Sequence, residues 1–252
     1  MIDLRSYQCM YFVGIGGIGM SALACFFKGR EYLVAGYERV KNPVCESLLE
    51  EGIDIHFKQE VSLIPEERLD PETTLVIYTP AVKESHKELA YFRENAFRVR
   101  KRAEVLGLLA NEYKSIAVAG THGKTSVSSM IAHFLYSTPA SCFAFLGGIM
   151  TNYHSNYLDG KDSERVVLEA DEYDRSFLHL KPDMAVITSM DADHLDVYYR
   201  HNALKHSFYE FADRVQNALI VKHGLRMPTQ GIRRLTYSLD NPEADYYADI
   251  KG

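Results

Sequence analysis

The feature that most constrains this chain is a turn at residues 118–126, Val-Ala-Gly-Thr-His-Gly-Lys-Thr-Ser, with an apolar segment before it and a helix-compatible pattern after it. This order is typical of a phosphate-binding loop, because backbone N–H groups around the two glycines can surround a phosphate at a helix N-terminus. Lys124 adds a positive charge, and the hydroxyl of Thr125 is a ligand suited to Mg²⁺. The loop is a shortened version, since the common spacing has glycine where Val118 stands. An ordinary strand-to-helix turn is the alternative.

Length and composition allow two domains and exclude several classes of protein. The chain has 252 residues, 46% of them hydrophobic, which is enough for a substantial core. A net charge of −6, with Lys and Arg residues scattered along most of the chain, predicts no basic face and disfavours nucleic-acid binding. No apolar run approaches the roughly 20 residues needed to cross a bilayer, and the start lacks a signal-peptide core, so we expect no membrane association and a cytoplasmic protein. Four widely spaced cysteines predict neither a zinc site nor a disulfide framework.

Apolar segments and helix-like segments alternate along the chain, which favours an α/β fold with parallel sheets covered on both faces. In the first part, strands are expected at 10–13, 33–36, 53–57 and 75–78, and helices at 22–27, 44–51 and 87–95. After a bridging segment at 103–110, strands are expected at 115–119, 142–146, 166–170, 184–188, 218–221 and 233–237, and helices at 124–136 and 203–214. The sequence therefore predicts a Rossmann-like domain at 1–110 followed by a P-loop-type α/β ATPase domain at 111–252.

Another glycine cluster, the first along the chain, follows the first expected strand. Gly14, Gly16 and Gly19 fit the spacing G-x-G-x-x-G, and Glu38 follows the second strand at the offset at which an acid usually binds ribose hydroxyls. The pattern predicts a nucleotide or diphosphate site, with close packing of a helix on the sheet as the alternative. A redox dinucleotide is the default ligand. The predicted phosphate-binding loop at 118–126 argues against a redox dinucleotide, because a hydride-transfer enzyme does not need ATP.

Acidic residues follow two of the apolar strands of the second part. Glu169, Asp171, Glu172 and Asp174 lie at the end of one strand, where one or two of them could meet a nucleotide-bound Mg²⁺. His194 lies among Asp191, Asp193 and Asp196 after the next strand, at the same predicted edge of the sheet. A solvated acidic turn and a structural histidine are the alternatives.

Four ordered motifs, at 14–21, 119–125, 169–172 and 193–196, together resemble the ATP-dependent Mur ligases of peptidoglycan synthesis. Supporting stretches lie at 79–82, 102–106, 145–148 and 176–180. The resemblance is greatest to the members that join L-alanine to UDP-N-acetylmuramate. A ligase that attaches a recycled tripeptide, a non-catalytic nucleotide-binding module and a nicotinamide oxidoreductase remain as alternative interpretations.

The resemblance implies that the first domain binds the UDP part of UDP-N-acetylmuramate and that the second domain binds ATP. The implied substrate-binding residues are Gly14, Gly16, Gly17, Gly19, Glu38, Thr79, Gly147 and Gly148. The implied ATP-binding residues are Gly120, Thr121, His122, Gly123, Lys124, Thr125 and Ser126. Lys124, Glu169 and His194 would be catalytic, Thr125 and Glu169 would hold one Mg²⁺, and His194 would help to bind a second. Such ligases convert the substrate carboxylate into an acyl phosphate, which the amine of alanine attacks.

Two departures from the family pattern lead to further expectations. Tyr37 and Glu38 stand where relatives commonly have Ser-Asp, so the resemblance does not carry the family's uridine contact over to these two residues. The family has a third, C-terminal domain that completes the adenine and amino-acid sites, and the sequence ends before such a domain. We therefore expect a fragment whose central domain is incomplete, which binds UDP-N-acetylmuramate but has little or no turnover without the missing domain.

Overall fold

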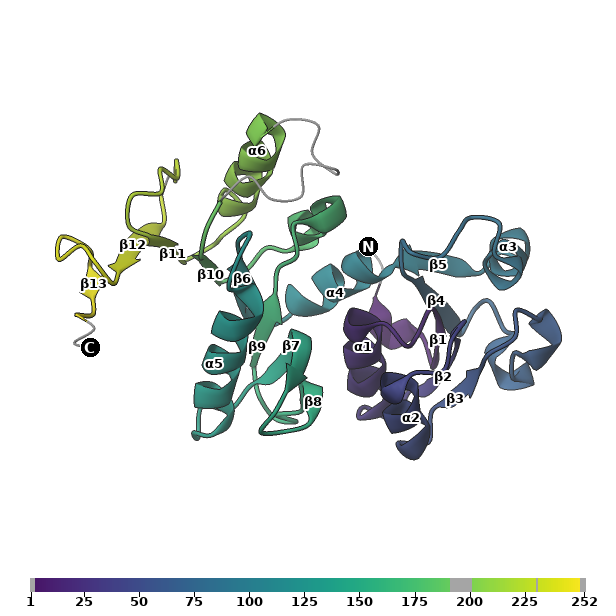
Figure 1. Ribbon diagram of the computed structural model, residues 1–252. Coiled ribbons are helices and arrows are strands. Elements are labelled where there is room, and N and C mark those ends of the chain that lie inside the picture. The colour runs from purple at the N-terminus through teal and green to yellow at the C-terminus, as the bar shows by residue number, and fades with distance from the viewer. Residues whose placement is uncertain (1–2, 191–200, 230, 250–252) are drawn as a thin grey trace.

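The chain folds into two α/β units, each built around its own sheet, as the computed structural model shows for residues 3–190, 201–229 and 231–249 (Figure 1). A five-stranded sheet forms the first unit and an eight-stranded sheet forms the second. Within the described part of the chain, no helix is long and apolar enough to cross a membrane. All four cysteines are free thiols.

The first unit has a wholly parallel sheet in the order β3-β2-β1-β4-β5. Its strands are β1 (Cys9–Val13), β2 (Leu33–Tyr37), β3 (Asp54–His56), β4 (Thr74–Tyr78) and β5 (Arg98–Lys101). Its helices are α1 (Ile18–Lys28), α2 (Pro43–Glu50) and α3 (Lys87–Glu94), with short 3₁₀ turns η1 (Leu4–Ser6), η2 (Val61–Leu63) and η3 (Glu66–Arg68).

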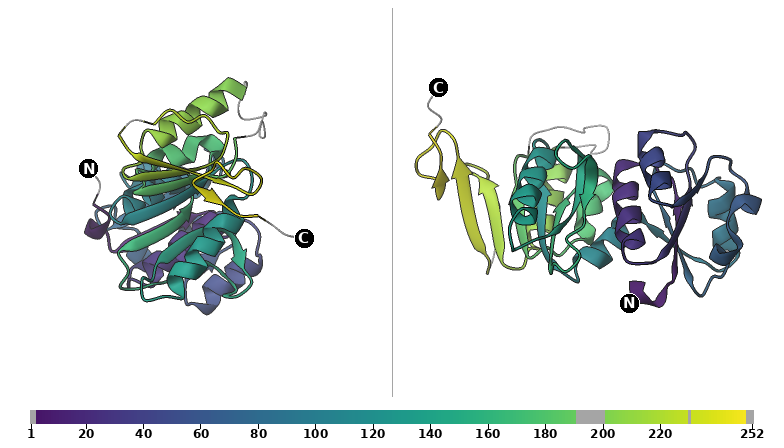
Figure 2. Two further views of the ribbon diagram at one scale, coloured as in Figure 1. Left: turned by 90° about the vertical axis from the view of Figure 1, so that its left-hand side faces the viewer. Right: turned by 90° about the horizontal axis from the view of Figure 1, so that it is seen from below.

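Helices cover both faces of this first sheet (Figure 2). The central strand β1 is fully buried, and its side chains alternate between the two faces as the strand period requires. Phe12 joins the core beneath α1, whereas Tyr11 packs against Phe92 of α3, with ring centroids 4.9 Å apart. The Rossmann-like arrangement predicted for this unit is confirmed.

The second unit has the strand order β13-β12-β11-β10-β6-β9-β7-β8. Its strands are β6 (Lys114–Ala119), β7 (Phe143–Met150), β8 (Ser155–Leu158), β9 (Arg165–Glu169), β10 (Met184–Ile187), β11 (Ala218–Lys222), β12 (Arg233–Ser238) and β13 (Tyr246–Tyr247). Helix α5 (Lys124–Tyr136) covers one face, and α6 (His201–Ala212) lies on the other with the 3₁₀ segment η4 (Tyr173–His179) (Figure 2). Phe177 of η4 stacks on Phe211 of α6 with centroids 4.9 Å apart.

Three strands were not expected from the sequence. β5, β8 and β13 are short, and β5 carries three basic residues, so none shows an apolar run. β8 pairs antiparallel with β7, at the edge of a sheet that is otherwise parallel as predicted. These strands form because neighbouring strands offer backbone hydrogen bonds, a tertiary effect that outweighs local preference.

Helix α4 (Arg102–Ala110) connects the units, and their apolar cores merge into one. Phe26 of α1 packs against Phe143, Phe145 and Tyr157 of the second sheet, with ring centroids 5.5, 5.6 and 6.3 Å away. The guanidinium of Arg30 covers the Phe26 ring at 3.7 Å and donates a hydrogen bond to the Tyr157 hydroxyl at 3.0 Å. A domain boundary near residue 110 remains our proposal, since α4 ends there and β6 begins at Lys114.

Candidate functional site

The first glycine turn lies between β1 and α1, and contacts with other loops hold it. Gly14 has a φ of +91°, and a Cβ placed on it would come 2.6 Å from the methyl group of Thr79, so both conformation and space favour glycine. The Gly16 N–H donates to the carboxylate of Glu38 at 2.8 Å. Glu38 therefore contacts the turn itself, at an N–H group that could otherwise face a phosphate.

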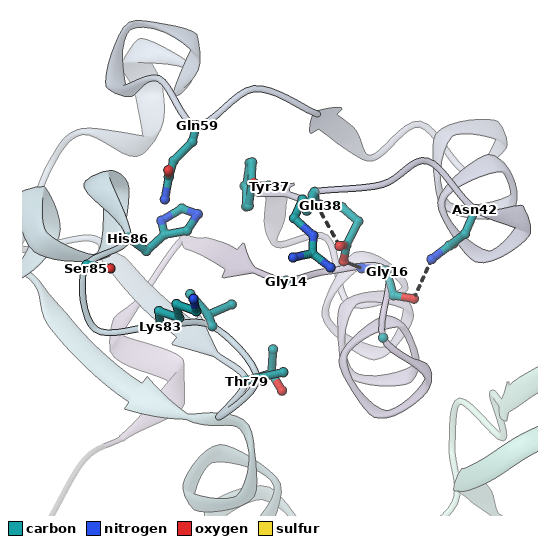
Figure 3. A pocket seen from close by; sticks show the side chains of 14 residues that line it. Gly14, Gly16, Tyr37, Glu38, Asn42, Gln59, Thr79, Lys83, Ser85 and His86 are labelled. Carbon is teal, nitrogen blue, oxygen red and sulfur yellow. Dashed lines mark hydrogen bonds between the residues drawn. The ribbon is translucent and has the colours of Figure 1, made fainter.

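A cavity of about 540 Å³ opens beside this turn (Figure 3). Gly14, Gly16 and Glu38 line one side, and the Tyr37 ring lies at the end of β2. Gln59 and His86 face the opening from the other side (Figure 3). The predicted residues Gly14, Gly16, Gly17, Glu38 and Thr79 all line this cavity. Its walls combine backbone amides, an aromatic ring and amide or imidazole groups, which suits a nucleotide with a planar base.

Buried polar side chains lie next to this cavity and were not recognised in the sequence. The Tyr11 hydroxyl donates to Glu88 at 2.7 Å and contacts His56 Nε2 at 2.8 Å. Glu88 has no exposed surface, and its burial raises the pKa of the carboxyl group to about 7. The ring of His86 packs against Tyr37 with centroids 4.6 Å apart, and both its nitrogens are buried without a hydrogen-bond partner among the described residues.

The raised pKa of Glu88 predicts a pH dependence of stability. A carboxyl group with a folded-state pKa above its ordinary value of 4.5 binds protons more tightly in the folded state, so stability falls as pH rises from about 4.5 to about 7. We expect Glu88→Gln to remove up to about 3 kcal/mol of this dependence. His56, whose pKa burial lowers, acts in the opposite direction, so the informative quantity is the difference between the two proteins.

Urea unfolding at intervals from pH 4.5 to pH 8 measures that difference. The exposed Glu94, on the same helix α3, supplies the control Glu94→Gln, which should keep the wild-type profile. Parallel profiles for wild type and Glu88→Gln would show that folding does not raise the pKa of Glu88.

The second glycine turn connects β6 to α5, in the strand–turn–helix order predicted for a phosphate-binding loop. Gly120 and Gly123 have φ values of +134° and +79°. A Cβ on Gly120 would lie 2.1 Å from Thr188 Oγ1, so only glycine fits between the loop and the end of β10. Ser189, the next residue, also contacts the loop: its hydroxyl contacts Thr121 Oγ1 at 2.9 Å and accepts from the His122 N–H at 2.9 Å.

Lys124, the first residue of α5, points back over its own loop. Its ammonium group donates to the Gly120 carbonyl at 2.7 Å and pairs with the carboxylate of Glu172 at 2.9 Å. Lys124 is 13% exposed and Glu172 only 1%, so the pair is largely out of water. Ser126, the third residue of α5, is exposed. The loop thus presents a positive charge at a helix N-terminus, an arrangement that attracts phosphate.

Thr125 and Glu169 place two oxygen atoms side by side. The Thr125 hydroxyl donates to Glu169 Oε2 at 2.8 Å, and the Gly147 N–H donates to the same oxygen at 3.1 Å. A Cβ on Gly148 would come 3.2 Å from the Thr125 methyl group, so Gly148 also lies beside this pair. Mg²⁺ usually takes one or two protein oxygens and completes its shell with phosphate and water, which this pair fits.

The remaining predicted metal ligand cannot be placed, because His194 lies outside the described residues. Among the residues that the structure does describe, no group of three or more His, Cys, Asp or Glu side chains is arranged to hold a metal ion. A protein-only metal cage is therefore not present in the described part of the chain.

The four acidic residues at the end of β9 and just after it make contacts in two different places. Glu169 and Glu172 contact the second glycine turn. Asp174 instead pairs with Lys101 of the first unit at 3.0 Å, and Asp171 accepts a hydrogen bond from the Tyr173 N–H at 3.0 Å. Two of the four candidates thus lie where a loop-bound nucleotide could meet them.

A second cavity, of about 330 Å³, lies between the two units. The first turn of α1 forms one wall, with Gly17, Gly19 and neighbouring residues, and Gly147 and Glu169 form part of the opposite wall. Arg102, at the start of α4, also lines it, although sequence reasoning placed it only in a supporting motif. The acid bonded to the second turn and the helix after the first turn therefore face one common space.

Comparison with known proteins gives consistent matches over nearly the whole chain. A family model described as "Mur ligase family, catalytic domain" matches residues 10–114, and one described as "Mur ligase middle domain" matches residues 118–251. The UDP-N-acetylmuramate--L-alanine ligase of Porphyromonas gingivalis is 47% identical over 244 residues, which cover 95% of this chain and 54% of that protein. The chain spans about half the length of the curated relatives it matches.

Solved structures support the fold. The UDP-N-acetylmuramate-alanine ligase of Thermotoga maritima superposes with a TM-score of 0.82 at 26% identity, covering 97% of this chain and 55% of that one. A UDP-N-acetylmuramate:L-alanyl-gamma-D-glutamyl-meso-diaminopimelate ligase from Neisseria meningitides has a TM-score of 0.81 at 20% identity, covering 92% of this chain and 78% of that one, a likeness that concerns the fold alone.

Proposed function

Because this chain belongs to the Mur ligase family, we propose that its two units bind UDP-N-acetylmuramate and Mg²⁺–ATP for ATP-dependent ligation of L-alanine in peptidoglycan synthesis. The first unit takes the uridine diphosphate at the turn containing Gly14 and Gly16. The second unit takes the triphosphate at the turn containing Gly120 and Gly123. Nucleotide substrates of this kind make the cytoplasm the proposed compartment.

One observation carries this proposal: the cavity between the units is lined both by the helix that follows the first glycine turn and by Glu169, which is bonded to Thr125 of the second turn. A substrate anchored by its diphosphate at the first turn can extend through this cavity toward the second. Its carboxylate then lies close to the γ-phosphate. Holding the two groups together lowers the entropic part of the barrier to their reaction. Two independent nucleotide sites would not need a common space.

The side chains have distinct proposed roles. Lys124, which contacts Glu172 in this structure, turns its ammonium group toward the β- and γ-phosphates, and Thr125 and Glu169 hold Mg²⁺. Bound Mg²⁺ supplies positive charge that offsets the repulsion between the substrate carboxylate and the triphosphate. Gly147, whose N–H group fixes Glu169, allows the substrate to pass close to the backbone. His194 is proposed to help with a second metal ion.

The proposed reaction has two steps. A carboxylate oxygen attacks the γ-phosphorus, and the bond to the β-phosphate oxygen breaks, giving an acyl phosphate and ADP. The neutral amine of L-alanine then attacks the acyl carbon, the C–O bond to phosphate breaks, and inorganic phosphate leaves with the proton that the nitrogen loses as the amide bond forms. Lys124 stabilises the charge on the phosphoryl group during its transfer.

Calorimetric titration of the 252-residue chain tests the substrate assignment. We expect binding of UDP-N-acetylmuramate, binding of a non-hydrolysable ATP analogue that requires Mg²⁺, and no binding of NAD. Binding of NAD in place of the UDP-sugar would indicate a redox dinucleotide site at the first glycine turn. Binding of the ATP analogue alone would reduce the proposal to a nucleotide-binding module.

The tripeptide-attaching ligases remain the nearest alternative within the family. The proposal favours alanine because the relative that is 47% identical bears the alanine ligase name, whereas the tripeptide ligase structure matches at 20% identity. Both classes use UDP-N-acetylmuramate, as their names state, so the titration above does not depend on this distinction.

A further inference from the structure

The guanidinium group of Arg102 stands apart from the hydrogen-bond and ion-pair network of the described residues. Arg102 is the first residue of α4 and is partly buried. It forms no hydrogen bond and no ion pair with any described residue. The carboxylates of Asp171 and Glu169 line the same cavity between the units and act on the guanidinium only through space. A partly buried, always charged side chain without a direct partner is costly to keep, which points to a partner that comes from outside the protein.

Gly19 shows why the guanidinium can lie where it does. A Cβ placed on Gly19 would come 2.7 Å from Arg102 Nη1 and 3.0 Å from its Cζ, so the guanidinium rests directly against the backbone of the first turn of α1. The third glycine of the first glycine cluster thus makes room for a side chain from α4. Any larger residue at position 19 would push this charged group away from the helix.

The surroundings of Arg102 suit an anion with several oxygens. Helix α1 has 11 residues and begins at Ile18, so its first-turn N–H groups and its dipole favour negative charge at this end. Arginine adds a planar set of donors that matches phosphate oxygens. Residues Gly17, Ile18, Gly19 and Arg102 line the same cavity, so both kinds of donor can reach one ligand.

We propose that Arg102 binds the diphosphate of the substrate together with the first turn of α1. This inference rests on the proposed function, since it assumes that a uridine diphosphate occupies the first unit. Arg102 belongs to the helix that connects the units, so it would distinguish phosphorylated uridine from uridine itself and would set the point at which the substrate enters the cavity.

Titrations with uridine, UDP and UDP-N-acetylmuramate test this inference, with NMR chemical shifts for the weak ligand and calorimetry for the others. Arg102→Met keeps the apolar stem and should weaken binding of UDP and of UDP-N-acetylmuramate by about 10- to 100-fold, the value of one or two charge-assisted hydrogen bonds. Affinity for uridine should stay unchanged. Arg100→Met, two residues away and outside the cavities described, should leave all three affinities at wild-type values.

A second variant moves the guanidinium without removing it. Gly19→Ala should lower affinity for UDP but not for uridine, while the flexible side chain of Arg102 relieves the clash and the fold persists.

An equal loss for uridine and UDP would mean general damage to the site and would overturn the inference. A loss confined to UDP-N-acetylmuramate would place Arg102 at the muramate carboxylate and would also overturn it. If the wild-type protein binds UDP and Arg102→Met binds it equally well, this inference alone is refuted. If the wild-type protein binds none of the three ligands, the proposed function is refuted as well.

Discussion

Replacing Lys124 by methionine is expected to abolish Mg²⁺-dependent binding of an ATP analogue, a loss of about 100-fold or more. The ammonium group of Lys124 lies against the second glycine turn, where it donates to the Gly120 carbonyl. Contacts to two phosphates are each worth about 1.5–3 kcal/mol. Calorimetry with a non-hydrolysable analogue measures the loss. Lys114→Met, which removes an exposed lysine of the same unit, is the matched control and should bind normally.

Stability must be separated from binding in this experiment, because Lys124 pairs with the buried Glu172. Breaking a buried ion pair from one side commonly costs about 3–5 kcal/mol. The double variant Lys124→Met/Glu172→Gln removes the carboxylate charge as well and should regain much of the lost stability without regaining nucleotide binding. A double variant that is stable and binds the analogue as wild type does would show that Lys124 does not contact the triphosphate.

Phe26→Ala is expected to lower the free energy of unfolding by about 3–5 kcal/mol, the usual cost of deleting a buried phenylalanine side chain. Phe26 is 3% exposed and contacts three aromatic rings of the second unit, so its loss opens a cavity at the point where the two cores merge. It also removes the ring that Arg30 covers.

Urea unfolding followed by circular dichroism measures this effect. Phe134→Ala is the control, because Phe134 lies on α5 with 68% of its surface exposed and should change stability by no more than about 0.5 kcal/mol. A loss below about 1 kcal/mol for Phe26→Ala would mean that the packing between the units contributes little. If the unfolding curve of Phe26→Ala separates into two steps, Phe26 couples the unfolding of the two units.

Much of the fold follows from local sequence. The helix expected at 124–136 has the bounds of α5, because an apolar strand, a glycine turn and a helix pattern follow one another there. Strand β5 was missed because Arg98, Arg100 and Lys101 leave only Val99 as an apolar residue, and its pairing with β4 is what makes it a strand. Strand β8 was missed for the same reason, since it depends on antiparallel pairing with β7.

The candidate site divides in the same way. The turn containing Lys124 and Thr125 could be predicted, because its chemistry is contained in consecutive residues. Which acids meet it could not, since Glu172 turns toward Lys124 whereas Asp174, with a left-handed φ of +50°, turns toward the first unit. Arg102 and Glu88 could not be assigned either. Their surroundings come from helices and strands that are distant in the sequence.

The central claim is that both glycine turns serve one reaction space between the units. A crystal structure of the complex with UDP-N-acetylmuramate, an ATP analogue and Mn²⁺ in place of Mg²⁺ tests it most directly, because anomalous scattering locates the metal ion. We predict a metal ion held by Thr125 and Glu169 and touching the triphosphate, with the muramate carboxylate reaching it through the cavity lined by Gly19 and Gly147. A metal ion bound away from Glu169, or a UDP-sugar that leaves this cavity empty, would contradict the account.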